Sequence, residues 1–108
     1  MSLLRLAAAQ FPVSEPKSWN EYADQVSAWV ADAANHGAQL LLFPEYAAMS
    51  LAALFDSTTR ADLDKQVSAM QSLREGYLDL HSTLAQKHGV HIVAGSFPWK
   101  LDDGRVVN

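Results

Sequence analysis

The chain has 108 residues, of which 49% are hydrophobic and 19% are charged, and its formal net charge is -4. This composition is typical of one globular domain or part of one, and it differs clearly from that of a disordered chain. The negative charge and the scattered Lys and Arg residues give no electrostatic footprint for nucleic acid or an anionic membrane surface. The chain contains no cysteine, which excludes a disulfide scaffold, a zinc ribbon and a thiol nucleophile within it.

The first third of the chain predicts a strand followed by a helix. The strand spans Leu3 to Phe11, and Pro12 ends it because proline cannot donate to a strand ladder. Ser18, with Glu21 three residues later, has the spacing of a capping box and predicts the start of a helix. Apolar residues at spacings of three and four give this helix one apolar face, made by Tyr22, Val26, Trp29, Val30 and Ala33.

Gly37 predicts the end of this helix, and the apolar run from Gln39 to Phe43 predicts a second strand. Strand, helix and strand in this order favour parallel strands joined by a right-handed crossover. Because the run has no polar alternation, we expect this strand to be buried on both faces, inside a sheet covered by helices. Glu45 follows Pro44 at the carboxyl end of the strand, where ligands gather in open α/β sheets. We therefore expect Glu45 to lie at the lip of a water-poor cleft, as a candidate acid or base.

The middle of the chain predicts a long connection and then a long helix. Residues 47–59 are rich in Ala, Ser and Thr and predict a connection that could include a helical turn. Thr59 and Asp62 resemble a second capping signal. An apolar stripe then predicts one amphipathic helix, which Gly76 could kink or divide; the stripe consists of Leu63, Val67, Met70, Leu73, Tyr77, Leu80 and Leu84.

The last part of the chain predicts two further strands. Gly89 ends the long helix, and residues 90–97 predict a third strand. Asp102-Asp103-Gly104 is a turn signal of the hairpin type, and residues 105–108 begin a fourth strand. His91 lies between apolar residues of the third strand, which favours a hydrogen-bonded structural histidine. Similarly, we expect Tyr46 and the three tryptophans to serve in packing.

The sequence gives no support for metal, cofactor or membrane binding. The four histidines, at positions 36, 81, 88 and 91, lack a metal-ligand spacing such as His-Glu-x-x-His, and no glycine-rich phosphate loop is present. No apolar run approaches the roughly 20 residues that a spanning helix needs. The amino terminus lacks the basic and long apolar regions of a signal peptide, so we expect a cytoplasmic location.

Five short segments occur in an order that is typical of one enzyme family. They are Ala7-Ala8-Ala9-Gln10, Ala33-Ala34-Asn35-His36-Gly37-Ala38, Leu41-Leu42-Phe43-Pro44-Glu45-Tyr46, His91-Ile92-Val93-Ala94-Gly95-Ser96 and Val107-Asn108. With these segments, essentially the whole chain resembles the amino-terminal part of the nitrilase superfamily, the carbon–nitrogen hydrolases. Phe-Pro-Glu is the most specific element. The resemblance implies an α/β fold, the four-layer α-β-β-α sandwich of the nitrilase type, of which this chain supplies the first strands and helices.

The resemblance also implies a chemistry and a role for Glu45. Members of this family use a Glu, a Lys and a Cys: the thiolate attacks an amide or nitrile carbon, and water hydrolyses the covalent intermediate. Glu45 matches the family's Glu, which implies that it is the general base. Lys87 and Lys100 do not match the family's Lys, and no Cys is present.

The missing residues imply that 1–108 is an apparently truncated amino-terminal part of a single carbon–nitrogen hydrolase domain. Alone, it should be inactive. For the complete protein, the resemblance implies a small amide or nitrile substrate and a homo-oligomer that is a dimer or larger. It implies no cofactor, no metal, and no nucleic acid or membrane partner.

Two interpretations without this chemistry stay open. The first is a non-catalytic α/β binding or assembly module, a three-layer unit that binds a small ligand or dimerises through an apolar helix face. The second is a receiver-like regulatory domain, which needs clustered acids at neighbouring strand ends to hold magnesium. The first predicted strand ends in Gln10-Phe11-Pro12, without an acid pair, so the second interpretation has little support.

Overall fold

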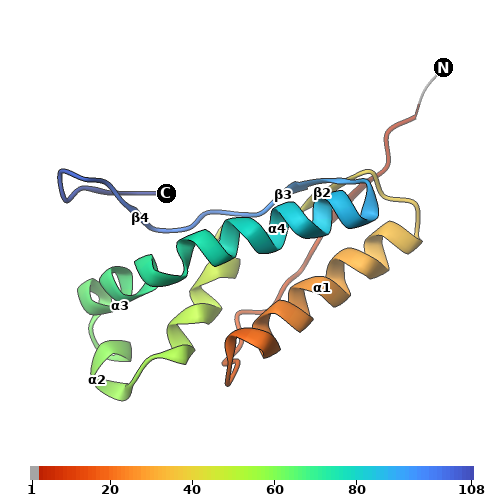
Figure 1. Ribbon diagram of the computed structural model, residues 1–108. Helices are drawn as coiled ribbons and strands as arrows, with labels where there is room; N and C mark the ends of the chain where they lie inside the picture. Colours follow the sequence, from red (N-terminus) through yellow and green to blue (C-terminus); the bar gives the residue numbers. More distant parts are fainter. Residues whose placement is uncertain (1–2) are drawn as a thin grey trace.

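A computed structural model describes residues 3–108, in which a three-stranded parallel sheet lies on two long helices (Figure 1). The chain therefore has α/β character, as predicted. Its elements, in chain order, are β1 (Leu6–Ala8), α1 (Trp19–Asn35), β2 (Leu40–Leu42), the 3₁₀ helix η1 (Ala47–Leu54), α2 (Ser57–Arg60), α3 (Leu63–Met70), the 3₁₀ helix η2 (Gln71–Leu73), α4 (Arg74–His88), β3 (His91–Val93), β4 (Trp99–Lys100) and β5 (Val106–Val107).

The three strands of the main sheet lie in the order β1-β2-β3, and both pairs are parallel. This confirms the parallel arrangement that the order of strand, helix and strand predicts. The register places Leu41 between Ala7 and Ile92. All three strands are shorter than predicted. The chain leaves the ladder at the end of β1 soon after Ala9 donates its amide hydrogen to the carbonyl of Leu42 at 2.9 Å. Phe11 then turns into the core, where it is 5% exposed.

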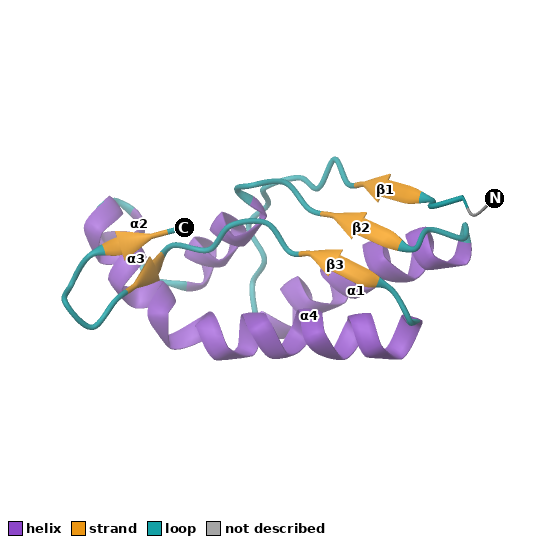
Figure 2. Cartoon of the chain, turned by 90° about the horizontal axis from the view of Figure 1, so that it is seen from above, coloured by secondary structure: helices purple, strands orange, loops and turns teal. Residues whose placement is uncertain are grey.

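Helices cover only one face of this sheet. Figure 2 shows the strands lying over α1 and α4. Leu41, in the central strand, is 3% exposed and belongs to the core. The opposite face, here called the open face, consists of Leu6, Ala8, Leu40, Leu42, His91 and Val93. Leu6 is 59% exposed and Val93 is 51% exposed. The expectations of a strand buried on both faces and of a three-layer unit are therefore wrong for the described residues, which form two layers.

The start and the end of α1 follow from local side-chain chemistry. Ser18 is the N-cap, and its hydroxyl accepts a hydrogen bond from the amide of Glu21 at 3.1 Å. The Glu21 carboxylate accepts from the amide of Lys17 at 3.3 Å, one residue before the partner that a capping box predicts. Gly37 has a φ of +85° directly after the helix, so the predicted left-handed stop is confirmed. Of the predicted apolar face, Tyr22, Val26 and Val30 are buried in the core and Ala33 is half-buried, whereas Trp29 is 37% exposed and the core packing expected for it is not observed.

The predicted long helix is interrupted, but not at Gly76. The break lies at η2, where the side-chain amide of Gln71 donates to the carbonyls of Val67 and Pro98 and its oxygen accepts from the amide of Lys100. Gly76 lies inside α4, where a Cβ atom would come within 3.4 Å of the Trp19 ring. That distance is an ordinary van der Waals contact, so packing against Trp19 does not require a glycine here, and contacts to the β4 region accompany the break.

The second predicted capping signal is one turn out of place. Asp62, rather than Thr59, is the N-cap of α3 and accepts from the amide of Lys65 at 3.2 Å. Thr59 lies inside the short helix α2, whose N-cap is Asp56. Asp56 accepts a hydrogen bond from the amide of Thr59 at 2.8 Å. This hydrogen bond is the main reason why the pKa of the Asp56 carboxyl is lowered.

The end of the chain forms a separate two-stranded antiparallel sheet. Trp99 pairs with Val107, and Lys100 pairs with Val106, so the predicted hairpin is confirmed, although β4 was not predicted as a strand. The guanidinium of Arg74 lies 4.5 Å from the centre of the Trp99 ring and donates to the carbonyl of Lys100 at 2.9 Å. These contacts attach the hairpin to α4. None of the helices between residues 3 and 108 has the length and hydrophobicity needed to cross a bilayer.

Candidate functional site

Glu45 lies immediately beyond the carboxyl end of β2, as the sequence predicts. It belongs to the Glu45 turn, defined here as residues 43–46, which joins β2 to η1. Its side chain is exposed, and it does not line either of the two cavities described below. The expectation of a water-poor cleft is therefore not met, because no described residue covers this carboxylate. Tyr46 is 63% exposed, so the packing role expected for it is not observed either.

The backbone of the Glu45 turn is bonded to the segment that follows β3, here called the β3 exit (residues 94–97). The amide of Phe43 donates to the carbonyl of Val93 at 2.9 Å. The carbonyl oxygen of Glu45 accepts from the amide of Ser96 at 3.2 Å, and the Ser96 hydroxyl donates to the same oxygen. Two adjacent strand ends are therefore joined directly beside the candidate base.

Gly95 allows the two loops to approach this closely. Its φ is +87°, and a Cβ atom built on it would lie 2.4 Å from the carbonyl oxygen of Pro44. Real Cβ contacts are not that short, so a side chain at this position would force the two loops apart. Glycine is the one residue that accepts both the backbone angle and the contact.

Helix α4 supports the β3 exit from below through a buried tyrosine. The hydroxyl of Tyr77 donates to the carbonyl of Ala94 at 2.7 Å, and its ring centre lies 5.0 Å from that of Phe97. Tyr77 is 2% exposed, and burial raises the pKa of its hydroxyl to about 12. It is therefore a neutral donor at any ordinary pH.

His81 is a second buried polar residue of α4, one turn beyond Tyr77. Its Nδ1 lies 2.7 Å from the carbonyl oxygen of Tyr77, and because a carbonyl only accepts, this nitrogen carries the hydrogen. Its ring contacts Phe43 edge to face, with centres 5.8 Å apart. Burial lowers the pKa of His81, so the neutral imidazole is the form that fits this site. The sequence pattern did not single out His81, although its i, i+4 spacing from Tyr77 on the apolar stripe was visible.

The larger of the two cavities lies between β1 and α1, at the edge of the sheet. It has a volume of about 420 Å³, with apolar walls that include Trp29 and Phe43 and a polar end formed by Arg5, Asp32 and His36. It reaches the start of the Glu45 turn at Phe43 but not the carboxylate.

His91, expected to be a structural residue, is exposed on the open face instead.

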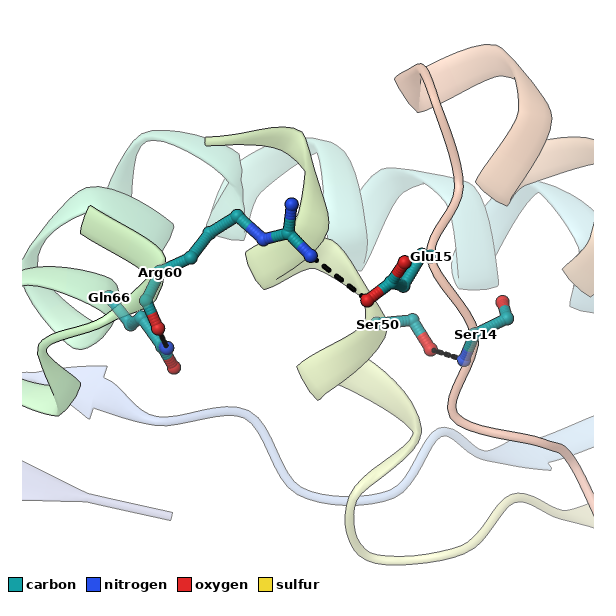
Figure 3. A network of polar contacts seen from close by, with 5 residues as sticks. All are labelled: Ser14, Glu15, Ser50, Arg60 and Gln66. Atoms are coloured by element: carbon teal, nitrogen blue, oxygen red, sulfur yellow. Dashed lines mark hydrogen bonds and ion pairs between the residues drawn. The ribbon is translucent and has the colours of Figure 1, made fainter. Parts of the chain in front are cut away.

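The second cavity, of about 280 Å³, lies between the β1–α1 connection and the η1–α3 region. Figure 3 shows its polar contacts: Arg60 forms an ion pair with Glu15 at 2.9 Å, and the Gln66 side chain donates to the Arg60 carbonyl. Ser50 is buried in η1, and its hydroxyl accepts from the amide of Ser14 at 3.0 Å (Figure 3). These bonds hold η1, which begins directly after the Glu45 turn, against the segment that follows β1.

Glu45 is the candidate acid or base that the described residues offer at this strand end. A carboxylate at the end of a strand can accept and return a proton. The chain has no thiol, and of the two lysines compared with the family's Lys, Lys87 lies in the last turn of α4 and Lys100 lies in the hairpin. Across residues 3–108, no group of three or more His, Asp or Glu side chains is placed to hold a metal ion.

Comparisons with known proteins agree with the sequence segments noted above. No curated protein and no solved structure matched the chain. A family model described as carbon–nitrogen hydrolase matches residues 5–108. That match runs through the Glu45 turn and the β3 exit and covers all of the helices and strands. The chain therefore belongs to the carbon–nitrogen hydrolase family.

Proposed function

We propose that Glu45 is the general base of a hydrolase that acts on non-peptide carbon–nitrogen bonds, amide or nitrile. The observation that supports this role most strongly is the placement of Glu45 on a turn whose backbone is bonded to the neighbouring strand end through Phe43 and Ser96. Proton transfer by a positioned group accelerates a reaction by about 10²- to 10⁴-fold, and positioning starts from a fixed backbone. Membership of the family supplies the type of reaction.

In this mechanism Glu45 takes the proton of a cysteine thiol as the sulfur attacks the substrate carbon. With an amide, it passes this proton to the departing amine; with a nitrile, the proton goes to the nitrile nitrogen, and water then adds to the thioimidate and expels ammonia. In both cases Glu45 later takes a proton from the water that attacks the acyl-enzyme and passes it to the released cysteine sulfur. The Lys and the Cys of this triad would come from residues outside 1–108, because the chain has no cysteine and neither Lys87, in the last turn of α4, nor Lys100, in β4, matches the family's Lys. Residues 1–108 would then be the amino-terminal part of a single domain and inactive alone.

The open face supports the finer architecture, an α-β-β-α sandwich. Two sheets that pack face to face lie about 10 Å apart and bury their facing apolar side chains. Leu6, Leu42 and Val93 offer such side chains, and a second sheet over them would complete the four layers. We propose that the same additional residues reduce the exposure of Glu45. A small amide or nitrile substrate, a homodimer or larger assembly and a cytoplasmic location complete the proposal, on the family resemblance and the sequence alone.

The first test is the mass of the native protein, together with the sequence of its complete transcript. The proposal requires a product larger than the 11.8 kDa of this chain, with a Lys and a Cys in the additional part. In that product, Glu45→Gln should lower turnover of a small amide by at least about 100-fold, because it removes the base and keeps the shape. Glu75→Gln, an exposed change in the first turn of α4, is the matched control and should leave turnover unchanged. Undiminished acyl-enzyme formation and turnover in Glu45→Gln would refute the assigned role.

Two observations favour the alternative, a binding or assembly module without chemistry: Glu45 is exposed, and the chain has no thiol. A native product of 11.8 kDa that is a stable, folded species by size exclusion with light scattering would support this alternative. A larger native product that hydrolyses amides would exclude it.

A further inference from the structure

We propose that Ser96 is a positioning residue that orients the Glu45 carboxylate by holding the Glu45 carbonyl, an inference that rests on the proposed role of Glu45. Ser96 gives this carbonyl oxygen two hydrogen bonds, one from its amide at 3.2 Å and one from its hydroxyl. A carbonyl oxygen has two lone pairs, so both acceptor positions are used. Two donors on one oxygen fix the plane of the peptide that follows Glu45.

The orientation of that peptide plane determines where the carboxylate can point. The plane sets ψ of Glu45, and the side-chain rotamers available to a residue depend on its φ and ψ. With the hydroxyl removed, the amide bond from Ser96 alone would hold the loop but would allow the plane to tilt. The Ser96 hydroxyl therefore mainly sets the orientation of the peptide plane after Glu45. The hydrogen bond from the Ser96 amide and the small size of Gly95 keep the two loops together.

The backbone around Ser96 is held in place by the core, whereas the carbonyl of Glu45 is held by its bonds to Ser96. On one side of Ser96, the carbonyl of Ala94 is held by the buried hydroxyl of Tyr77 at 2.7 Å. On the other side, Phe97 is 6% exposed and packs on the Tyr77 ring. By contrast, the side chains of Glu45 and Tyr46 are exposed, so side-chain packing does little to restrain the turn. Helix α4 therefore fixes the β3 exit, and the β3 exit in turn restrains the backbone of Glu45.

The test compares Ser96→Ala with Ser96→Thr, which keeps the hydroxyl, and with Ser72→Ala. Ser72 is a matched control because its exposed hydroxyl also donates to a backbone carbonyl, that of Ala69 at 2.9 Å, outside the Glu45 turn. In the complete native protein, amide hydrogen exchange reports the order of the turn. Ser96→Ala should accelerate exchange of the amides at positions 47 and 96 by about tenfold, whereas the control should not.

In the full-length enzyme, Ser96→Ala should lower kcat by about 10- to 100-fold with KM within about twofold, because a small misplacement of a catalytic group affects the chemical step. Ser96→Thr should restore most of kcat. Normal kcat and normal exchange in Ser96→Ala would overturn the proposal, as would an equal loss of kcat in Ser96→Thr. Full turnover in Glu45→Gln would instead refute the catalytic role of Glu45, and the exchange data would still decide whether Ser96 orders the turn.

Discussion

The contact between Gly95 and Pro44 predicts an unusually costly glycine-to-alanine substitution. Gly95→Ala has two separate costs. An L-residue at a φ of +87° is strained by about 1–2 kcal/mol. The new Cβ would also lie 2.4 Å from the Pro44 carbonyl oxygen, a backbone atom that cannot rotate away as a side-chain end can. Relieving this overlap means separating the Glu45 turn from the β3 exit, with the loss of one or two hydrogen bonds of about 1 kcal/mol each. The expected loss of unfolding free energy is therefore about 2–4 kcal/mol.

Gly89→Ala isolates the first of these costs. Gly89 ends α4 with a φ of +63°, and a Cβ built there meets no atom within 4 Å. It should lose only about 1–2 kcal/mol, so the two variants should differ by about 1–2 kcal/mol, the cost of the lost hydrogen bonds. Urea unfolding followed by far-ultraviolet circular dichroism measures this difference, and a midpoint about 1 M lower for Gly95→Ala is expected. A difference below about 0.5 kcal/mol would refute the reasoning, because it would mean that the two loops separate without cost.

Two further predictions concern the buried polar residues beneath the sheet. Tyr77→Phe should lower the unfolding free energy by about 1–3 kcal/mol, because it leaves the Ala94 carbonyl without its hydrogen-bond donor. In contrast, Tyr22→Phe should be neutral or stabilising by up to about 1 kcal/mol. The buried hydroxyl of Tyr22 has no partner among residues 3–108, so the reverse order in urea unfolding would contradict this account. Burial lowers the folded-state pKa of His81 below 6.5, so the unfolded chain binds the proton first and stability should fall as pH drops below 6.5. The stability advantage of wild type over His81→Gln should therefore shrink between pH 7.5 and pH 5 in urea titrations, and a constant difference would exclude His81 as the cause.

The parts of the fold that were predicted correctly depend on short-range chemistry. Ser18 caps α1 through an amide three residues away, and Gly37 and Gly89 end helices with their own backbone angles. The break at η2 was not predictable in this way. It coincides with bonds from Gln71 to Pro98 and Lys100, which are 27 and 29 residues away. An apolar stripe that continues through the break at correct spacing carries no sign of such distant contacts.

The candidate site shows the same division. A proline and a glutamate after an apolar strand located Glu45 correctly, because the end of a strand is a local property. The contacts of Glu45 with Ser96 depend on the register of β2 against β3, which pairs Leu42 with Val93 and so brings the two exits side by side. The exposure of Glu45 depends on what covers the turn, and no pattern within the turn itself reports that.

The error about the faces of the sheet has a physical reason that bears on the proposed architecture. In β2, Leu40, Leu41 and Leu42 are all apolar, although only Leu41 faces the helices and is fully buried. A strand with one solvated face usually alternates apolar and polar residues, so this composition is that of a strand covered on both sides. The neighbouring strands contribute Leu6 and Val93 to the same open face, in register with β2. A contiguous apolar face of this kind marks a surface that another layer contacts. The sequence of β2 therefore matches the four-layer sandwich proposed for the complete protein better than it matches the two layers that residues 3–108 form.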